Sequence, residues 1–435
     1  MSNKPNRKQL NTLPSLVVSD EEGNLFDLPE YAMLGRSGNE VVIPERESII
    51  PLPYGSDLHH LPDRYALGID RRNGKIRTVK SYRGIKVFAA SAFLAPAHTA
   101  LYLSAYVKGE GAQKLPLFAY SAVGFDGRNF VATALRVDKD KRQDCENFDQ
   151  GEIIKQGKQL LKKFKGNRLT THLIERCAFD YLCPAARNWV MGRWEAPIPV
   201  SMGCNSECQG CISKQPEESD IPSTQDRLNF TPTVDEIVEY CVPHLESAPR
   251  AVVSFGQGCE GEPLTQAKLI EDTIREMRKK TKKGTINLNS NASMPEAVER
   301  ICKAGLDSIR ISLNSAQAPY YDRYFKPKGY GLPQIRESMK IAKDLNKWVS
   351  LNYFIYPGFT DRMDEMNEMT ALIKEIPVDM IQMRNLNMDP DMYWDEMGLG
   401  DVKAEKVGMR KWMAKIRESR HGITFGYFNP PLNKE

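Results

Sequence analysis

The sequence predicts an α/β fold with parallel strands, preceded by a small and mostly β domain. From residue 196, short β-rich runs alternate with amphipathic helical patterns. This order is typical of parallel strands joined by crossover helices. In nearly every run, one strand face is apolar and the other is polar. Unpaired polar groups are costly in a dry core. We therefore expect a curved sheet whose polar face lines a cavity for a polar ligand.

The chain has 435 residues, which fits two or three domains. Its 41% hydrophobic and 27% charged residues are normal for a soluble globular protein, and a net charge of +4 is too weak to indicate a nucleic-acid partner. Nine cysteines, an odd number, occur without a signal peptide or an apolar stretch long enough to span a membrane. These features favour a reducing compartment, and we expect a cytoplasmic protein.

Residues 1–64 are polar and are expected to form a loosely attached arm. Residues 65–190 are expected to form a β-rich domain with a connecting helix. Its strands are predicted at residues 87–94, 100–106, 117–123 and 129–137, with a hairpin turn at 125–128. The helix at 152–164 carries or adjoins Lys155, Lys158, Lys162, Lys163 and Lys165. We interpret these lysines as a solvated helix face rather than as a surface for a phosphate backbone.

Residues 196–390 carry the strand–helix units, and residues 391–435 are expected to form a cap. The strands are predicted at residues 198–202, 251–255, 285–289, 308–314, 349–355 and 380–385. Because successive side chains of a strand point to opposite faces, Arg310, Ser312 and Asn314 share the polar face of the fourth strand. In the cap, a helix is expected near 403–417 and a β-like run at 423–428, which could close the mouth of the cavity.

Three cysteines lie in the spacing C-x3-C-x2-C, at Cys204, Cys208 and Cys211. Three thiolates can hold three irons of a cubic cluster and leave the fourth iron open. A structural zinc site with a distant fourth ligand is the alternative. We favour the cluster, because zinc modules more often pair one C-x2-C with a second, and no second pair exists here.

A glycine-rich turn, residues 256–264, follows the second predicted strand. Such a turn lets the backbone approach a ligand closely, and the carboxylate of Glu262 suits an ammonium group. An ordinary strand-to-helix turn, with Pro263 at the first helical position, is the alternative interpretation.

The cysteine triplet, the Gly261-Glu262-Pro263 run and the polar strand ends resemble the radical S-adenosylmethionine (SAM) superfamily over residues 196 to about 390. The resemblance implies an incomplete (β/α)6 TIM-like barrel, a [4Fe-4S] cluster on the three cysteines, and SAM on the open iron. It also implies reductive cleavage of SAM to a 5′-deoxyadenosyl radical, which abstracts hydrogen from an unidentified substrate, with a flavodoxin or ferredoxin as electron donor. The implied SAM contacts are Gly261, Glu262, Asn289, Arg310, Ser312 and Asn314. One departure is Gly210, where the family usually has an aromatic residue.

Other candidates follow from position alone. Cys259, inside the turn, could donate a hydrogen atom or simply pack, and Gln382 and Arg384 are expected to face substrate. Cys145, Cys177 and Cys183 could hold an auxiliary cluster, although we favour buried thiols.

The competing function is a non-catalytic zinc-binding or RNA-binding module that uses the cysteine triplet and the lysine-rich helix. Neither the polar cavity nor the Gly-Glu-Pro turn is needed by such a module. A peptide, a metabolite and an RNA base remain open as substrates, and so do the fate of SAM and the oligomeric state.

Overall fold

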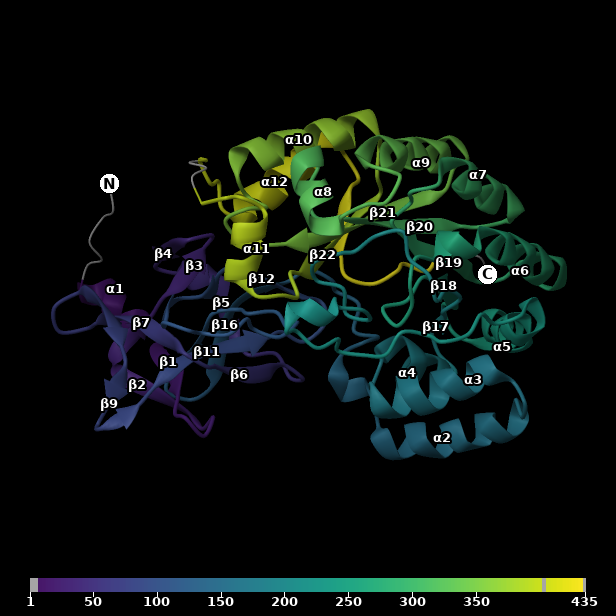
Figure 1. Ribbon diagram of the computed structural model, residues 1–435. Coiled ribbons are helices and arrows are strands. Elements are labelled where there is room, and N and C mark those ends of the chain that lie inside the picture. The colour runs from purple at the N-terminus through teal and green to yellow at the C-terminus, as the bar shows by residue number, and fades with distance from the viewer. Residues whose placement is uncertain (1–6, 401–403, 433–435) are drawn as a thin grey trace. The chain divides into compact units, whose positions relative to one another are not determined.

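The computed structural model of the chain describes residues 7–400 and 404–432. It contains two compact units. Figure 1 colours the chain by residue number. The first unit comprises residues 1–139, 354–367 and 383–415, and the second comprises residues 140–353, 368–382 and 416–435.

The first unit is built mainly from antiparallel strands. An eleven-stranded sheet comprises β1 (Ser15–Ser19), β2 (Leu25–Met33), β5 (Ile49–Pro51), β6 (Asp57–Leu61), β7 (Arg64–Asp70), β8 (Lys75–Val79), β11 (Phe88–Phe93), β12 (His98–Ala100), β14 (Tyr106–Lys108), β15 (Val123–Phe125) and β16 (Phe130–Arg136). Two small sheets and three helices also lie in this unit, namely β3 (Gly35–Ser37), β4 (Glu40–Val42), β13 (Leu103–Ser104), β9 (Ser81–Tyr82), β10 (Ile85–Lys86), α1 (Arg7–Thr12), η1 (Arg46–Ser48) and α11 (Pro390–Glu396).

The expectation of a loosely attached arm up to residue 64 is wrong for residues 15–61. These residues supply β1 to β6, and Leu16, Val18 and Leu28 are buried in the core of the sheet. Their short apolar runs are separated by polar turns, which concealed the strand pattern. The predicted hairpin is confirmed, since the Asp126 N–H donates to the Asn129 carbonyl over 3.1 Å between β15 and β16.

Two other predicted strands are shorter than expected. The run at 100–106 is divided among β12, β13 and β14, and the run at 117–123 is a strand only from Val123. Proline and turn residues near these runs limit the pairing.

The second unit opens with helices. They are η2 (Cys145–Asn147), α2 (Gln150–Lys163), α3 (Arg168–His172), the π-helical segment η3 (Leu173–Asp180) and α4 (Pro184–Val190). The Asp149 side chain accepts from the Glu152 N–H and begins α2. All five lysines expected on the solvated face of α2 and just after it are exposed.

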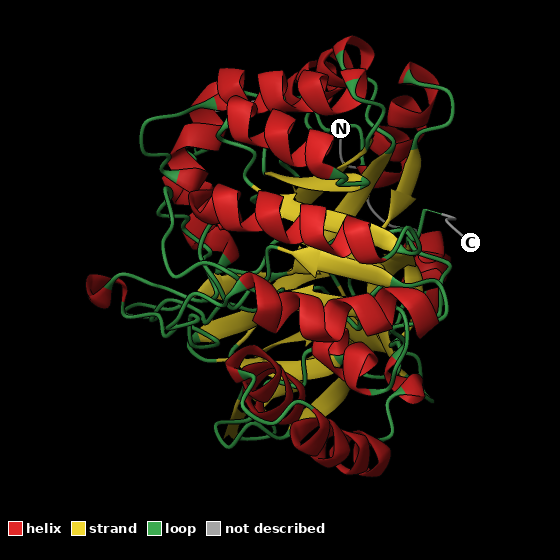
Figure 2. Cartoon of the chain, turned by 90° about the vertical axis from the view of Figure 1, so that its right-hand side faces the viewer, coloured by secondary structure: helices red, strands yellow, loops and turns green. Residues whose placement is uncertain are grey.

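A parallel sheet follows, with its strands in chain order. Its strands are β17 (Glu195–Ile198), β18 (Val252–Phe255), β19 (Thr285–Ser290), β20 (Ser308–Leu313), β21 (Trp348–Ile355), β22 (Met380–Asn385) and β23 (Thr424–Gly426). The segments that connect these strands contain helices. They are η4 (Glu217–Ser219), α5 (Val234–Ser247), η5 (Pro263–Gln266), α6 (Ala267–Lys280), α7 (Pro295–Ala304), α8 (Ala318–Phe325), α9 (Leu332–Asp344), α10 (Met363–Glu375) and α12 (Met409–Ser419). Figure 2 shows helices lying in front of these strands, the layer arrangement of an α/β fold.

The strand faces agree with the alternation in the sequence. Ile309 and Ile311 of β20 are fully buried on the helix-covered side, and Arg310 lies on the other face. The residue ranges of the first predicted strand shift by a few positions, since β17 begins at Glu195 and ends at Ile198.

The C-terminal segment extends the parallel sheet instead of only capping it. Thr424 pairs in parallel with Met380, so β23 is a seventh strand beside β22. The expected helix near 403–417 is found as α12, and its expected start at position 403 lies outside the described residues.

Across residues 7–400 and 404–432, no helix is both long and apolar enough to cross a bilayer.

Candidate functional site

The three cysteines of the triplet lie on the loop that follows β17, and all three are half-buried. Burial raises the pKa of Cys208 well above its usual value, and the neighbouring Cys211 and Cys204 raise it further. The three thiols are therefore close enough to repel one another as anions. Such a set is stable as thiolates only around a positively charged centre, which is what iron provides.

Arg227 approaches the triplet from a later part of the same loop region. Its Nη2 donates to Cys211 Sγ over 3.5 Å, and its Nε donates to Ser213 Oγ over 3.2 Å. A guanidinium group therefore lies against one sulfur of the triplet. Nothing in the spacing of the sequence marked Arg227.

The cysteine loop is held by backbone bonds to α8. The Glu207 N–H donates to the Phe325 carbonyl over 3.1 Å, and the Gln209 N–H donates to the Tyr324 carbonyl over 2.9 Å. These bonds do not involve the cysteine side chains, so they hold the loop independently of what the thiols bind.

A polar cluster fixes the same loop from the end of β19. The Asn291 amide donates to Asn205 Oδ1 over 2.8 Å and to the Tyr330 hydroxyl over 3.1 Å. The Ser206 and Tyr330 hydroxyls lie 2.6 Å apart. Tyr330 comes from the loop after α8. Because loops at the carboxyl ends of parallel strands meet at one edge of the sheet, this position could have been suspected from the strand order.

The glycine-rich turn is bonded to the start of the cysteine loop through Glu260. Its buried carboxylate accepts from the N–H groups of Val200, Ser201 and Gln257 at 2.7, 2.8 and 2.7 Å. Burial raises the pKa of Glu260 to about 8. The sequence prediction named Glu262 and missed this second acidic residue of the turn.

Two glycines permit close backbone contacts in the turn. A Cβ at Gly261 would lie 1.8 Å from the Gly203 carbonyl oxygen, and a Cβ at Gly256 would lie 1.8 Å from that of Asn289. Gly256 also has a φ of +77°, a conformation that favours glycine. Gly261 is thus needed where the turn touches the cysteine loop.

Glu262 lies at the centre of these contacts and is only 5% exposed. Its carboxylate accepts from the Ser290 hydroxyl at 2.6 Å, the Asn291 N–H at 2.8 Å and the Leu264 N–H at 3.0 Å. Burial raises its pKa to about 7. A carboxylate has about four acceptor sites, so capacity for a further donor remains.

Asn289 and Asn314 have structural partners. The Asn289 amide donates to the Gly256 carbonyl over 2.7 Å, and the Asn314 amide donates to the Tyr320 carbonyl over 3.0 Å. Asn314 is fully buried. Both were expected to contact SAM, and in the structure each holds a loop at the edge of the sheet.

Arg310 and Gln382, for which the sequence suggested different ligands, are bonded to each other. Arg310 Nη1 donates to Gln382 Oε1 over 3.1 Å. The Gln382 amide donates to the Phe428 carbonyl and to Asn429 Oδ1 at 3.2 and 3.1 Å. Gln382 is fully buried, so its predicted contact with substrate is replaced here by contacts with the C-terminal segment.

The polar face continues into a buried network on its first strands, β17 to β19. Glu195 Oε1 accepts from the Ser254 hydroxyl and from the Asn429 amide, both at 2.7 Å. The Asn287 amide lies 3.4 Å from Ser254 Oγ. Part of the polar face is thus satisfied within the protein.

Ser312, Asn352 and Arg384 occupy the remaining part of the polar face and are half-buried. Ser312 is paired with Asn352 across β20 and β21. The buried Oδ1 of Asn352 has no hydrogen-bond partner among residues 7–400 and 404–432. A buried acceptor without a partner is costly, and a polar ligand on this face would satisfy it.

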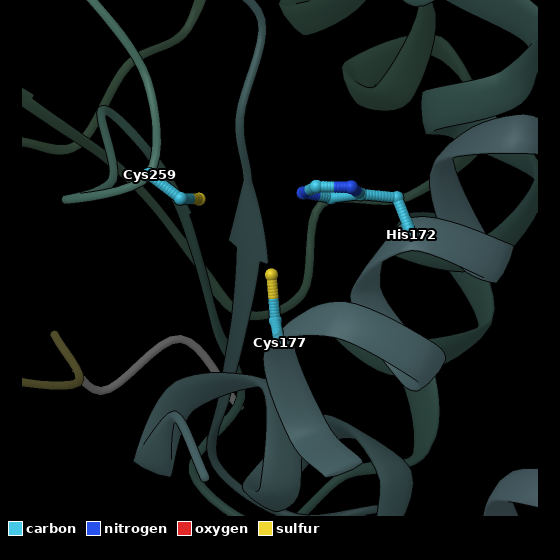
Figure 3. A group of neighbouring side chains, drawn as sticks. All are labelled: His172, Cys177 and Cys259. Carbon is cyan, nitrogen blue, oxygen red and sulfur yellow. The ribbon is translucent and has the colours of Figure 1, made fainter. Parts of the chain in front are cut away.

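The remaining cysteines are distributed differently from the expectation. Cys259, the candidate hydrogen donor, points toward Cys177 and His172 (Figure 3). Cys145 and Cys183 are half-buried, and the described residues do not bring them together with Cys177 as a compact ligand group. Cys241 and Cys302 lie in the core.

The comparison with known families decides the identity of this region. Residues 198–370 match the family model of the radical SAM superfamily. The chain contains a radical SAM domain. Members of this superfamily are enzymes, and they use a [4Fe-4S] cluster and SAM. The match begins within β17 and includes the cysteine triplet and the glycine-rich turn.

Several solved structures are partly similar to this chain. A radical SAM methyltransferase from Sphaerobacter thermophilus is 12% identical with a TM-score of 0.37, and 54% of this chain and 66% of that chain are covered. SuiB from Streptococcus suis, solved with SAM bound, is 14% identical with a TM-score of 0.37, at 71% and 70% coverage. The FeFe-hydrogenase maturase HydG from Carboxydothermus hydrogenoformans is 14% identical with a TM-score of 0.36, at 62% and 65% coverage.

The chain spans a little under two thirds of the methyltransferase and of the maturase. No curated protein matches the chain.

Proposed function

We propose that this protein binds a [4Fe-4S] cluster through Cys204, Cys208 and Cys211 and cleaves SAM reductively beside it, to abstract hydrogen from a substrate. The observation that carries the proposal is the joining of the cysteine loop to the glycine-rich turn, with Gly261 against Gly203 and Glu260 bonded to Val200 and Ser201. When bound, the cluster supplies the electron that breaks a carbon–sulfur bond of SAM.

The residues of the turn suit the amino group of SAM. The Glu262 carboxylate is buried and retains acceptor capacity. The pKa of the Cys204 thiol is raised by burial first, and the charge of Glu262 raises it further. A buried carboxylate without a cation is unfavourable, and an ammonium group would stabilise its charged form. Gly261 gives the ligand access to the backbone at the same place.

The polar face of the sheet suits the carboxylate and the sugar of SAM. Arg310 offers a guanidinium group, which binds carboxylates in a bidentate geometry. Ser312 and the buried amide oxygen of Asn352 lie beside it on β20 and β21. We assign Asn289 and Asn314 to the support of this surface, with direct SAM contacts as a second role.

The fold supports the same proposal. We propose that β17 to β22 form the incomplete (β/α)6 barrel of the superfamily, with β23 as an addition, and that the antiparallel unit is a separate accessory domain. We propose a flavodoxin or a ferredoxin as the reductant, and a peptide, a metabolite or an RNA base as the substrate. Arg384 is the remaining candidate for a substrate contact.

The non-catalytic zinc or RNA module is not favoured. The lysines of α2 are an ordinary exposed face, and one of them pairs with Glu152. The superfamily match covers the triplet that such a module would need.

The test is anaerobic reconstitution followed by metal analysis and a SAM cleavage assay. We expect about four irons and four sulfides per chain, and slow release of 5′-deoxyadenosine and methionine on reduction. Cys204→Ala, Cys208→Ala and Cys211→Ala should each lose the visible charge-transfer absorption. Cys302→Ala is the control, because that buried thiol lies on α7.

Zinc in place of iron on the triplet would refute the proposal. So would methylthioadenosine or S-adenosylhomocysteine as the sole SAM products under reducing and anaerobic conditions.

A further inference from the structure

A second group of soft metal ligands lies outside the cysteine triplet. One ligand atom from each of His172, Cys177 and Cys259 lies within 4.8 Å of the other two. Figure 3 shows the three side chains pointing toward one another. Cys177 and Cys259 are 3% and 7% exposed, so this group is largely closed to solvent. It is the only such group of histidine, cysteine or acidic residues found over 7–400 and 404–432.

The group joins two parts of the chain that are distant in sequence. His172 ends α3, Cys177 lies in the π-helical segment η3, and Cys259 lies in the glycine-rich turn. π-helical segments are rare and are frequent at functional sites, because the wider turn redirects side chains. Here the segment directly follows His172 and brings Cys177 beside it.

The His172 ring has an unsatisfied polar atom. Its Nε2 is buried and has no hydrogen-bond partner among the described residues. The ring packs edge-on against Phe230, at 6.1 Å between centroids, which limits its freedom to turn toward solvent. A buried imidazole nitrogen beside two thiols is a set of ligand atoms that suits a metal ion.

We propose that His172, Cys177 and Cys259 bind one zinc ion, separate from the iron–sulfur site. Two thiolates and one imidazole are ligands that zinc prefers, and three protein ligands leave a fourth position for water or another donor. A cubic cluster is a poorer occupant, because three ligand atoms that converge within 4.8 Å suit a single ion.

The zinc ion would connect the helical segment to the glycine-rich turn. The Cys259 carbonyl accepts from the Leu228 N–H over 2.7 Å, and the next residue, Glu260, is bonded to Val200 and Ser201. Fixing Cys259 therefore fixes the part of the glycine-rich turn that is bonded to the start of the cysteine loop. The role of the ion is to position this segment, not to react.

The experiment compares metal contents of full-length variants purified anaerobically and dialysed against excess zinc and then buffer. Wild type is expected to retain one zinc in addition to its iron. Cys177→Ser, Cys259→Ser and His172→Asn should each reduce retained zinc at least tenfold. Cys302→Ser, which changes another buried thiol, should retain it. A triple Cys204→Ala, Cys208→Ala, Cys211→Ala variant should lose iron and keep zinc, which separates this proposal from the proposed function.

Replacement of zinc by cobalt(II) provides a second readout that does not depend on the yield of each variant. Thiolate-to-cobalt charge-transfer absorption should appear in wild type and in the triple-alanine variant, and should be absent from Cys177→Ser. The proposal is overturned if wild type retains no zinc, if the retained zinc survives all three ligand substitutions, if the site holds iron instead, or if Cys177 and Cys259 are joined by a disulfide in the anaerobic protein.

Discussion

Arg227 donates a hydrogen bond to the sulfur of Cys211, with Nη2 and Sγ 3.5 Å apart. The guanidinium is also bonded to Ser213, so its position is fixed from two sides. The reduction potential of an iron–sulfur cluster depends on net charge and on hydrogen bonds to its sulfurs. This contact therefore places one positive charge and one donor at the sulfur of a proposed cluster ligand.

Replacing Arg227 by Met should lower the reduction potential of the cluster. The reduced cluster carries more negative charge and so benefits more from the cation. We expect a shift of about 30–60 mV to more negative values, which for a one-electron couple corresponds to about 0.7–1.4 kcal/mol. The measurement is a potentiometric titration followed by electron paramagnetic resonance.

Arg275→Met is the matched control, because Arg275 is an exposed arginine on α6 that pairs with Glu271. It should leave the potential unchanged. An unchanged potential in Arg227→Met, with full iron content, would show that Arg227 does not act on the cluster.

The contact between Gly261 and Gly203 gives an unusually direct steric test. Gly261→Ala would bring a Cβ to 1.8 Å from the Gly203 carbonyl oxygen, whereas a Cβ at Gly203 itself would meet only Thr265 Oγ1, at 3.8 Å. Overpacking typically costs about 1–3 kcal/mol. Gly261→Ala should therefore lower the melting temperature and the iron retained after desalting.

Gly203→Ala, on the opposite side of the same contact, should keep both properties near wild type. Equal losses in the two variants would mean that the cysteine loop, rather than the steric contact, is sensitive to any added side chain.

The sequence predicted the parallel strands well because helices cover one face of each strand. In β20, the alternation of Ile309 and Ile311 with Arg310 is a direct record of that burial. The cysteine triplet could also be recognised from the sequence, because its three cysteines lie within one loop and their spacing depends on no other part of the chain.

The partners of the polar face could not be predicted. Glu195, Gln382 and Asn429 are bonded into the same face, yet Asn429 comes from the C-terminal segment, which joined the sheet through β23. A strand pattern reports which side chains are polar and not what satisfies them. Gln382 was therefore interpreted as a ligand contact.

The group of His172, Cys177 and Cys259 was also beyond the sequence. Cys177 was considered with Cys145 and Cys183 because they are near in the chain, and Cys259 was considered alone. Their approach depends on the π-helical segment and on the path of the glycine-rich turn, which no spacing records.

His244 should make the protein less stable in mild acid. It is buried on α5, and its Nε2–H donates to the Trp194 carbonyl over 2.7 Å. Burial lowers its pKa from 6.5 to about 4. Between these values the unfolded histidine binds a proton and the folded one does not, so stability falls as pH falls. The loss should reach about 2 kcal/mol by pH 5.

The measurement is the melting temperature at pH 7.5 and at pH 5 for wild type and His244→Gln. Acid titration of carboxyl groups affects both proteins and cancels in the difference, so the variant should show the smaller decrease. His421→Gln, which changes an exposed histidine, should behave as wild type. A decrease as large in His244→Gln as in wild type would exclude His244 as the cause.

Replacing Arg310 by Met should weaken SAM binding with little effect on the fold. A charge-assisted hydrogen bond to a carboxylate is worth roughly 1.5–3 kcal/mol, so the dissociation constant should rise about 10- to 100-fold. Within the protein, the substitution removes the bond to Gln382, a contact with a neutral amide oxygen at 3.1 Å. Anaerobic equilibrium binding of SAM and the melting temperature without SAM are the two measurements.

Gln382→Met separates the two roles of Arg310, because it breaks the same bond but keeps the guanidinium. The buried amide of Gln382 also donates to the Phe428 carbonyl and to Asn429 Oδ1. Gln382→Met should therefore be less stable than Arg310→Met while it retains SAM affinity. The opposite pattern, with normal SAM affinity and a lost fold in Arg310→Met, would make Arg310 a structural partner of Gln382. The carboxylate of SAM would then need a different cation on the polar face.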